Sequence, residues 1–84
     1  MTLTQYEKVN GKSDVQVAEK CGLATSTINR LRRRRMHASL ELSLQIERGL
    51  DGDVRAEELP LTPETRAALA ALRLQMVPAQ GTAA

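Results

Sequence analysis

The chain contains a single aromatic residue, Tyr6, and neither Phe nor Trp. Apolar residues nevertheless make up 42% of its 84 residues, so the core has to be built from Leu, Val, Ile, Ala and Met. Aliphatic cores of this kind favour helices, and we expect an all-α fold. The shortage of aromatic rings also argues against single-stranded nucleic acid as a ligand, because unpaired bases are usually bound by stacking on such rings.

The length limits the chain to one small domain, and domains of this size often gain stability from a second copy of themselves. Its one cysteine, Cys21, excludes an internal disulfide, and Cys21 with the only histidine, His37, is too few for a zinc site. We expect no metal and no cofactor. No apolar run approaches the ~20 residues of a membrane span, and the N-terminus lacks the features of a signal peptide. A cytoplasmic protein is therefore expected.

The charges are unevenly distributed along the chain. Residues 1–37 carry eight Lys and Arg against three acids, whereas residues 38–84 carry four Arg against seven acids. The net charge of +2 thus combines a basic half with an acidic half. Five arginines, Arg30 and Arg32 to Arg35, lie within six residues, which indicates that the basic half contacts a polyanion.

Hydrophobic spacing and capping residues predict a compact bundle of about five short helices. The first covers residues 2–10. The second begins at the cap Ser13 and ends at Gly22, which supplies the positive φ of a sharp turn. The third begins near Thr25 and ends before Arg35.

Residues 39–50 permit two interpretations. Their leucines alternate with polar residues as in a strand, but helical spacing gathers the polar residues on one narrow face. We favour a helix, because no partner strand of comparable quality exists elsewhere in the chain. Residues 50–54 are read as a turn, and residues 55–59 as a helical turn or an extended connection.

A last helix is predicted over residues 61–77, with Thr62 as its cap and Pro63 at its first position. Residues 78–84 are expected to form a flexible tail. The apolar stripe of this helix would either pack on its own domain or dimerise with the same helix of a second protomer, and we favour dimerisation. It consists of Leu69, Leu72 and Met76.

The spacing of residues 14–33 matches two helices joined by a short turn, which is the helix-turn-helix plan. Ala18 is small enough for the second helix to cross close over the first, and Gly22 takes the turn conformation. Residues 1–60 are therefore predicted to form a helix-turn-helix DNA-binding domain. The residues expected to fill the space between and beneath the two helices are Val17, Cys21, Leu23, Ile28 and Leu31.

The same stretch resembles the phage Cro- and repressor-like (XRE-type) helix-turn-helix family, and SLELSLQIERGLDGDVRAEEL resembles the segment that follows the motif in small YdaS-like prophage regulators. The resemblance covers roughly residues 13–60. It implies a helix over residues 39–50, a homodimer on palindromic operator DNA, and a bacterial cell or a phage-infected host as the setting. The chain departs from the family at Ala24, which leaves Thr25 to cap the third helix one residue late, and at Asp14, where relatives often have a Gln near a phosphate.

Helical geometry divides the side chains of residues 24–34 between the protein and the DNA. At about 100° per residue, Ala24, Ile28 and Leu31 share the side that faces the protein. The side free to enter a groove carries Ser26, Asn29, Arg30 and Arg33.

Two sets of DNA-contacting residues follow. An arginine matches the acceptors of guanine and an asparagine those of adenine, whereas arginines at the flanks would reach phosphates. The predicted base-reading residues are Thr25, Ser26, Thr27, Asn29 and Arg30. The predicted phosphate-binding residues are Arg32, Arg33, Arg34, Arg35, Lys12, Ser13, Gln16 and His37.

The leading hypothesis is a sequence-specific regulator of double-stranded DNA: a homodimeric Cro-like repressor, which could repress its own operon, including an operon of phage or anti-CRISPR genes. An alternative is an antitoxin or adaptor whose acidic C-terminal half binds a protein partner while the helix-turn-helix binds operator DNA. A third is RNA binding through the arginine-rich helix, although such segments usually fold on binding. An enzyme is not expected, because His37 has no matching Ser, Cys or carboxylate constellation.

Overall fold

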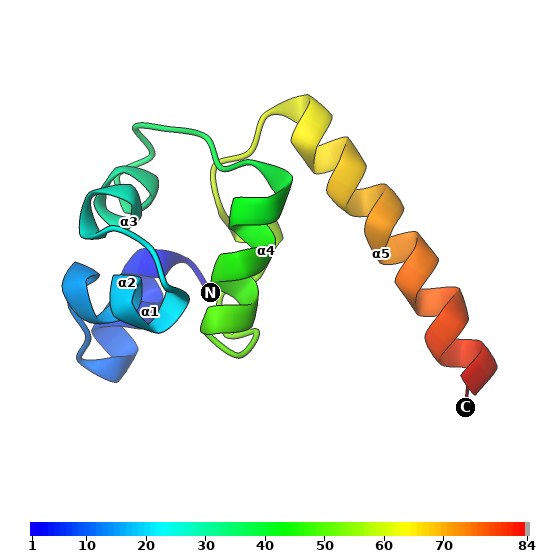
Figure 1. The fold of residues 1–84 in the computed structure, drawn as a ribbon, viewed down its shortest axis with the longest axis horizontal. Helices are drawn as coiled ribbons and strands as arrows, with labels where there is room; N and C mark the ends of the chain where they lie inside the picture. The colour runs from blue at the N-terminus through cyan, green and yellow to red at the C-terminus, as the bar shows by residue number, and fades with distance from the viewer. Residues whose placement is uncertain (84) are drawn as a thin grey trace.

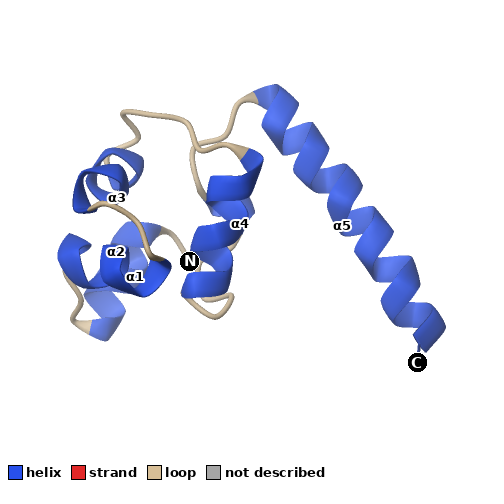
Figure 2. Ribbon diagram, in the orientation of Figure 1, coloured by secondary structure: helices blue, strands red, loops and turns tan. Residues whose placement is uncertain are grey.

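The computed structural model describes residues 1–83, with side chains for residues 1–75. Within this range it contains five α-helices, one 3-10 helix and no strand, so the prediction of an all-α fold is confirmed (Figure 2). The elements are α1 (Leu3–Asn10), α2 (Asp14–Cys21), α3 (Thr25–Arg32), α4 (Leu40–Gly49), η1 (Ala56–Glu58) and α5 (Pro63–Ala83).

The helices are arranged around one aliphatic core. Helices α1, α2 and α3 form one group, α4 stands beside this group, and α5 lies on the opposite side of α4 (Figure 1). Helix α2 packs against both α3 and α4. The largest fully buried core side chains come from α2, α3, α4, α5 and the connection between α4 and α5: Val17, Ile28, Leu31, Ile46, Leu50, Val54, Leu59 and Leu69.

Four of the five α-helices begin at a side chain that caps their free backbone N–H groups. Thr2 and Ser13 form capping boxes with the Gln three residues later, and Ser39 accepts a hydrogen bond from the Leu42 N–H. Thr62 accepts one from the Thr65 N–H in the same way. Each predicted cap at Ser13, Ser39 and Thr62 is confirmed, because a hydroxyl three residues before a helical N–H is a purely local signal.

Helix α3 is the exception. Its N-cap is Ala24, which offers no side-chain hydrogen bond. The expectation that Thr25 would cap one residue late is wrong, because Thr25 is already the first helical residue.

A residue with left-handed backbone conformation follows each of the helices α1 to α4. Glycine occupies this position after α1 and α2, at Gly11 and Gly22, but Arg34 (φ 58°) occupies it after α3 and Asp51 (φ 56°) after α4. After α3, the Arg35 N–H donates to the Arg30 carbonyl at 2.8 Å and the Arg34 N–H donates to the Leu31 carbonyl at 3.0 Å. This hydrogen-bond pair is the Schellman motif, and it ends the helix before Arg35 as predicted.

Helix α4 settles the ambiguity of residues 39–50 in favour of a helix. Its C-terminal end lies against the end of α2: a Cβ added at Gly49 would meet the Cys21 Cα at 2.9 Å. Nearby, the Gln45 amide donates to the Cys21 carbonyl at 2.8 Å. Only a glycine allows two helix backbones to approach this closely, so α4 fixes the position of α2 from behind.

The N-terminal part of α5 is anchored to its own chain. Leu69 is 0% exposed, which contradicts its assignment to a dimer interface. Arg73 forms ion pairs with Glu47 of α4 and Glu57 of η1. Leu72 is half-buried, and the side chain of Met76 lies outside the described residues.

The C-terminal part of α5 projects away from the other helices (Figure 1). The helix continues to Ala83, so the structure does not reproduce the predicted boundary between a helix over residues 61–77 and a tail. No helix in the described range is both long and apolar enough to cross a bilayer.

Candidate nucleic-acid interface

Helix α3 is held on its inner side by aliphatic side chains. Ile28 and Leu31 are 0% and 1% exposed, and they pack in one core with Val17 and Ala18 of α2. The turn between the two helices contains Gly22 with φ 69°, where the Leu23 N–H donates to the Ala18 carbonyl at 2.9 Å. The burial predicted for this pair of helices is confirmed, except that Ala24 is exposed because it precedes the first helical turn.

The outer side of α3 presents a stripe of polar and basic side chains to solvent. Ser26, Arg30 and Arg33 follow one another at intervals of four and three residues, which places them on one helix face, and all three are exposed. Thr25 is exposed beside Ser26, whereas Thr27 is half-buried. The stripe therefore consists of hydrogen-bonding groups with nothing covering them.

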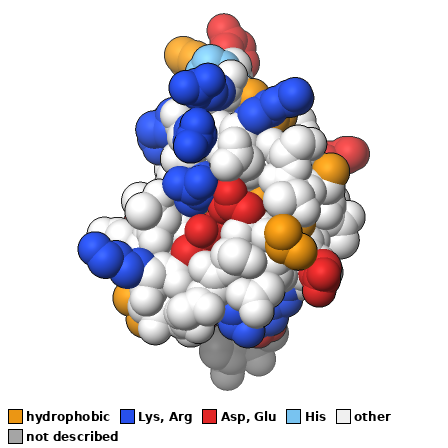
Figure 3. Space-filling model, turned by 90° about the vertical axis from the view of Figure 1, so that its left-hand side faces the viewer, with side chains coloured by type: hydrophobic (Ala, Val, Ile, Leu, Met, Phe, Trp, Pro, Cys, Tyr) orange, Lys and Arg blue, Asp and Glu red, His pale blue; other side chains and the backbone are white. Residues whose placement is uncertain are grey.

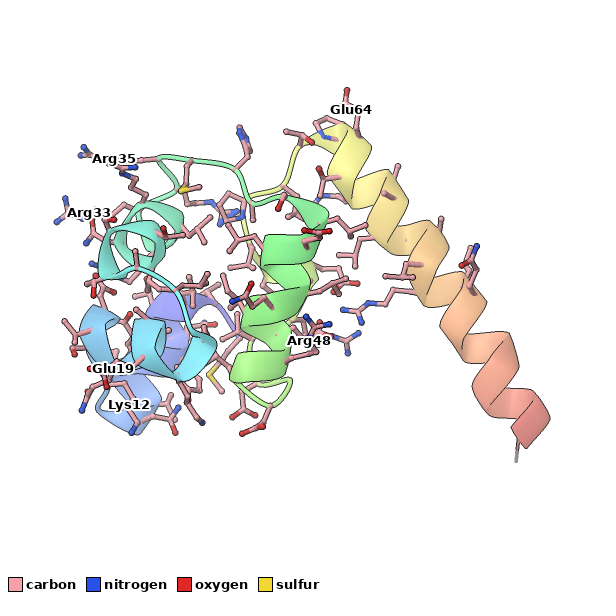
Figure 4. The ribbon with its side chains drawn as sticks, viewed as in Figure 1. Lys12, Glu19, Arg33, Arg35, Arg48 and Glu64 are labelled. Carbon is pink, nitrogen blue, oxygen red and sulfur yellow. The ribbon has the colours of Figure 1, made fainter. Side chains whose placement is uncertain are left out.

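The turn that follows α3 continues this stripe with further cations. Arg34, Arg35 and His37 are all exposed. In Figure 4, Arg33 and Arg35 point outward, away from α4 and α5. Among the described side chains, no carboxylate forms an ion pair with Arg30 or with Arg33 to Arg35. We call the exposed residues Thr25, Ser26, Arg30, Arg33, Arg34, Arg35 and His37 the basic face.

A view onto this side of the molecule shows the concentration of charge. Lys and Arg side chains gather in its upper part next to the histidine, and a group of acidic side chains lies directly below them (Figure 3). A surface of this kind attracts a polyanion over a distance of about one Debye length, ~8 Å at physiological salt. The acidic group marks its lower boundary.

Asp14, at the start of α2, is the centre of a hydrogen-bonded cluster that reaches α3. Its carboxylate accepts bonds from the Arg32 Nε and Nη2 at 2.9 and 3.1 Å and from the Asn29 Nδ2 at 2.9 Å. Arg32 holds the pKa of Asp14 well below its ordinary value, mainly through these hydrogen bonds. With Glu7 of α1, 3.8 Å from the Arg32 Nε, these residues form what we call the Asp14 cluster: Glu7, Asp14, Asn29 and Arg32.

Several predicted contacts are already engaged inside the protein. Asn29 and Arg32 were assigned to bases and phosphates, but both are half-buried and bound to Asp14. Ser13 and Gln16, assigned to phosphates, are exposed but bond to one another in the capping box of α2. Lys12 is exposed in the loop before α2, at a distance from α3 along the lower edge of the molecule (Figure 4).

Glu7 was missed from the sequence although a signal for it exists. Leu3 and Tyr6 define the buried side of α1, and Glu7 lies four residues after Leu3 and hence on the same side. A carboxylate on an apolar stripe has to find a partner. Asp14 was read only as a residue favourable to the helix dipole, and its contacts to α3 depend on how the helices pack.

The uncapped N-terminus of α3 adds to the basic face. Because Ala24 offers no acceptor, the first backbone N–H groups of α3 lack the side-chain partner that the other α-helices have. Free N–H groups at a helix N-terminus can donate to a phosphate oxygen. They lie next to Thr25 and Ser26, at the opposite end of the helix from Arg33.

No family model, curated protein or solved structure matches this chain. No three His, Cys, Asp or Glu side chains in the described part of the chain are grouped as metal ligands would be.

Two carboxylates of the acidic half, those of Glu47 and Glu57, hold α5 in place. The Glu57 carboxylate accepts from the Arg73 Nε at 2.9 Å, and Glu47 bonds to both Arg73 and the Ala56 N–H. Hydrogen bonds from Arg73 lower the pKa of Glu57 to about 2 and also that of Glu47. The carboxylates of Glu47 and Glu57 are therefore already paired within the chain.

Proposed function

We propose that the protein is a sequence-specific double-stranded DNA-binding transcriptional regulator, acting as a homodimeric repressor of the Cro-like helix-turn-helix type. The observation that carries the proposal is the basic face. It presents exposed arginines without acidic partners on the outer side of a helix that is anchored from beneath by Ile28 and Leu31. Repression would follow from occupying an operator.

The dimensions of α3 suit the major groove. An α-helix is about 10–12 Å across with its side chains, and the major groove of B-DNA, about 12 Å wide, admits one helix; the eight residues of α3 give a length of about 12 Å within the groove. With Ser26 and Arg30 toward the base edges, Arg33 to Arg35 would lie near the phosphates at the edge of the groove. Three such phosphate contacts per protomer predict a salt slope, in log K against log salt concentration, of roughly −3 for one protomer and roughly −5 for the homodimer.

The roles within the interface differ from those that the sequence suggested. Arg30 is the best reader of guanine, because its guanidinium is exposed and can bond to O6 and N7 together. Thr25 and Ser26 remain candidates for a base edge or a phosphate. Asn29 and Arg32 are better explained as residues that orient α3.

The projecting end of α5 supports the dimer. Leu74 is 71% exposed, and no charged residue follows Arg73 in the sequence. An exposed leucine on a projecting helix gains free energy when it is covered. The proposed homodimer is expected to bind an inverted repeat with half-sites about one helical turn apart.

Selection of bound duplexes from a random pool tests the proposal directly. The expected product is a short inverted repeat bound by two protomers. Failure to enrich any sequence, with binding equal to all duplexes or absent, would remove the proposed function. Enrichment of a structured RNA in a parallel selection would favour RNA binding instead.

Replacing Arg30 with alanine should relax the preference at one base pair of each half-site. The expected loss is about 1–3 kcal/mol of discrimination against the wrong base, with little change in affinity for unrelated duplexes. Arg35→Ala is the matched control, because loss of a phosphate contact should weaken all sequences similarly. Repeating the selection with both variants measures the difference, and unchanged specificity in Arg30→Ala would contradict the assigned role.

Replacing Arg34 with glycine should make the protein more stable while lowering its affinity for DNA. A left-handed backbone costs a non-glycine residue about 1–2 kcal/mol, partly offset by the entropy that glycine loses on folding, so the variant should be more stable by about 0.5–1 kcal/mol. Its affinity for DNA should nevertheless fall, by roughly five- to tenfold, because a phosphate contact is lost. Thermal denaturation and fluorescence anisotropy measure the two effects.

Asp51→Gly provides the matched control for Arg34→Gly. Asp51 occupies the same position after α4 with nearly the same φ, and its 3.6 Å pair with Lys20 is exposed and contributes little. The variant should gain stability, though less because aspartate tolerates this conformation better, and should bind DNA as the wild type does. If Arg34→Gly also bound as the wild type does, Arg34 would have no role at the interface.

A further inference from the structure

The Asp14 cluster connects three helices at one point. Asn29 and Arg32 are separated by three residues and therefore emerge on the same side of α3, one turn apart. Both bond to the single carboxylate of Asp14, which belongs to the first turn of α2. Two attachments along one side of a helix resist its rotation about its own axis.

This attachment determines which side chains α3 exposes. Arg30 and Arg33 each follow a cluster residue by one position, which places them about 100° further round the helix. If α3 turned so that Asn29 and Arg32 left Asp14, then Arg30 and Arg33 would also change direction. The hydrophobic contacts of Ile28 and Leu31 are less directional than hydrogen bonds. The hydrogen bonds of the Asp14 cluster therefore restrict the rotation of α3 more narrowly than these apolar contacts do.

The Arg32 guanidinium forms hydrogen bonds with only one of the two carboxyl groups of the cluster. Asp14 occupies Arg32 through two hydrogen bonds, and Glu7 reaches the Arg32 Nε only at 3.8 Å. The Glu7 Oε2 is buried and lacks a hydrogen-bond partner among the described residues. A protonated carboxyl in this position can donate a hydrogen bond to Asp14, whereas a charged one would face another carboxylate.

The groups that surround Glu7 favour the protonated form. The charged groups that face its carboxyl are Asp14 from α2 and Arg32 from α3; η1 contributes Glu58 to a small pocket that Arg32 and Arg34 also line. Burial, with the neighbouring Asp14 carboxylate acting in the same direction and Arg32 opposing, raises the pKa of Glu7 to about 7.

We propose that the Asp14 cluster is a proton-dependent clasp: with one proton held between its two carboxyl groups it fixes the rotation of α3, and loss of the proton loosens α3. Glu7 and Asp14 are thus positioning residues for the basic face. The consequence for DNA rests on the proposed function, but the clasp itself does not. Since DNA selects the correctly rotated helix, DNA binding and proton binding strengthen one another reciprocally.

Titration of the free protein tests the clasp without DNA. Carboxyl-detected NMR should give Glu7 a midpoint near pH 7, and the backbone amides of Ser26, Arg30 and Arg33 should shift with the same midpoint. The melting temperature should fall as the pH rises from about 4.5 to about 7, because over that range the folded state holds a proton that the unfolded state has released. A Glu7 midpoint between about pH 4 and 5, or amides of α3 that do not follow it, would overturn the proposal.

Glu7→Gln imitates the protonated state, because its amide can donate to Asp14 at every pH. Between about pH 6 and 8 the affinity of the wild type for its selected duplex should fall by about fivefold, the lower end of usual coupling strengths, and that of Glu7→Gln should stay nearly constant. Glu19→Gln is the matched control: it removes the same charge from an exposed position on α2 (Figure 4) and should retain the wild-type pH dependence.

A second control removes the imidazole of the basic face, because histidine is the side chain that most often changes charge near neutral pH. His37→Gln should retain most of the pH dependence. If the dependence vanished in His37→Gln and persisted in Glu7→Gln, the proposed link between the clasp and DNA would be overturned. If no variant bound duplex DNA at any pH, the proposed function would fail, whereas the NMR titration would still decide for or against the clasp.

Discussion

Replacing Leu69 with alanine will lower the free energy of unfolding by about 3 kcal/mol. The side chain is 0% exposed and belongs to the core that α5 shares with the rest of the chain. Leucine-to-alanine changes at such positions cost about 2–5 kcal/mol, from lost hydrophobic transfer and from the cavity that remains. Urea denaturation monitored by circular dichroism measures the change, and the loss should be accompanied by easier release of α5.

Leu74→Ala is the matched control for Leu69→Ala. Leu74 is 71% exposed on the same helix, so its truncation should change the unfolding free energy of the isolated protomer by no more than about 0.5 kcal/mol and should instead weaken self-association in analytical ultracentrifugation. The difference between Leu69→Ala and the wild type should be the same at all protein concentrations. A difference that appeared only at concentrations where the wild type dimerises would place Leu69 between protomers after all.

The helices were predictable because their signals are local. Caps such as Ser13 and Ser39 act on N–H groups only three residues away, and Gly22 ends α2 through its own backbone freedom. The conflict between strand and helix in residues 39–50 was resolved by a global consideration, the lack of a partner strand. The extent of α5 could not be predicted in this way, because Pro78 and Gly81 are local signals that end a helix, whereas α5 continues to Ala83.

The candidate interface was predictable only where it depends on helix periodicity. The inner residues Ile28 and Leu31 and the outer residues Ser26 and Arg30 lie where a spacing of about 100° per residue puts them. Asn29 was expected on the outer side, because a helical wheel treats α3 in isolation and contains no information about Asp14 on another helix. The helical spacing was also applied to residues up to Arg34, although the chain leaves the helix at Arg33.

This difference changes how the arginine-rich segment is understood. A run of consecutive basic residues suggests that all of them have the same role, but in the structure these side chains differ in direction and in partners. Arg32 is turned inward to Asp14, Arg30 and Arg33 lie on the outer side of α3, and Arg34 follows in a left-handed turn. One arginine of the run thus stabilises the position from which the others reach solvent.

Reversing two charges on the basic face should produce the largest loss of binding. The double variant Arg30→Glu, Arg33→Glu should bind its duplex about a thousandfold more weakly than the wild type. Each arginine is expected to contribute a charged hydrogen bond of about 1.5–3 kcal/mol, and each glutamate adds repulsion from the phosphates, so a total of about 4 kcal/mol is a modest expectation. Both side chains are exposed, so the free energy of unfolding should change by no more than about 1 kcal/mol.

The matched control is the double variant Arg48→Glu, Arg66→Glu, which changes the net charge by the same amount through exposed residues of α4 and α5. In Figure 4, Arg48 lies near the end of α4 that is remote from Arg33 and Arg35. Fluorescence anisotropy at fixed salt should show a loss of less than about fivefold, because exposed charges beyond a Debye length are largely screened. Equal losses in the two double variants would mean that binding depends on overall charge, and an unchanged affinity in Arg30→Glu, Arg33→Glu would mean that DNA does not contact α3.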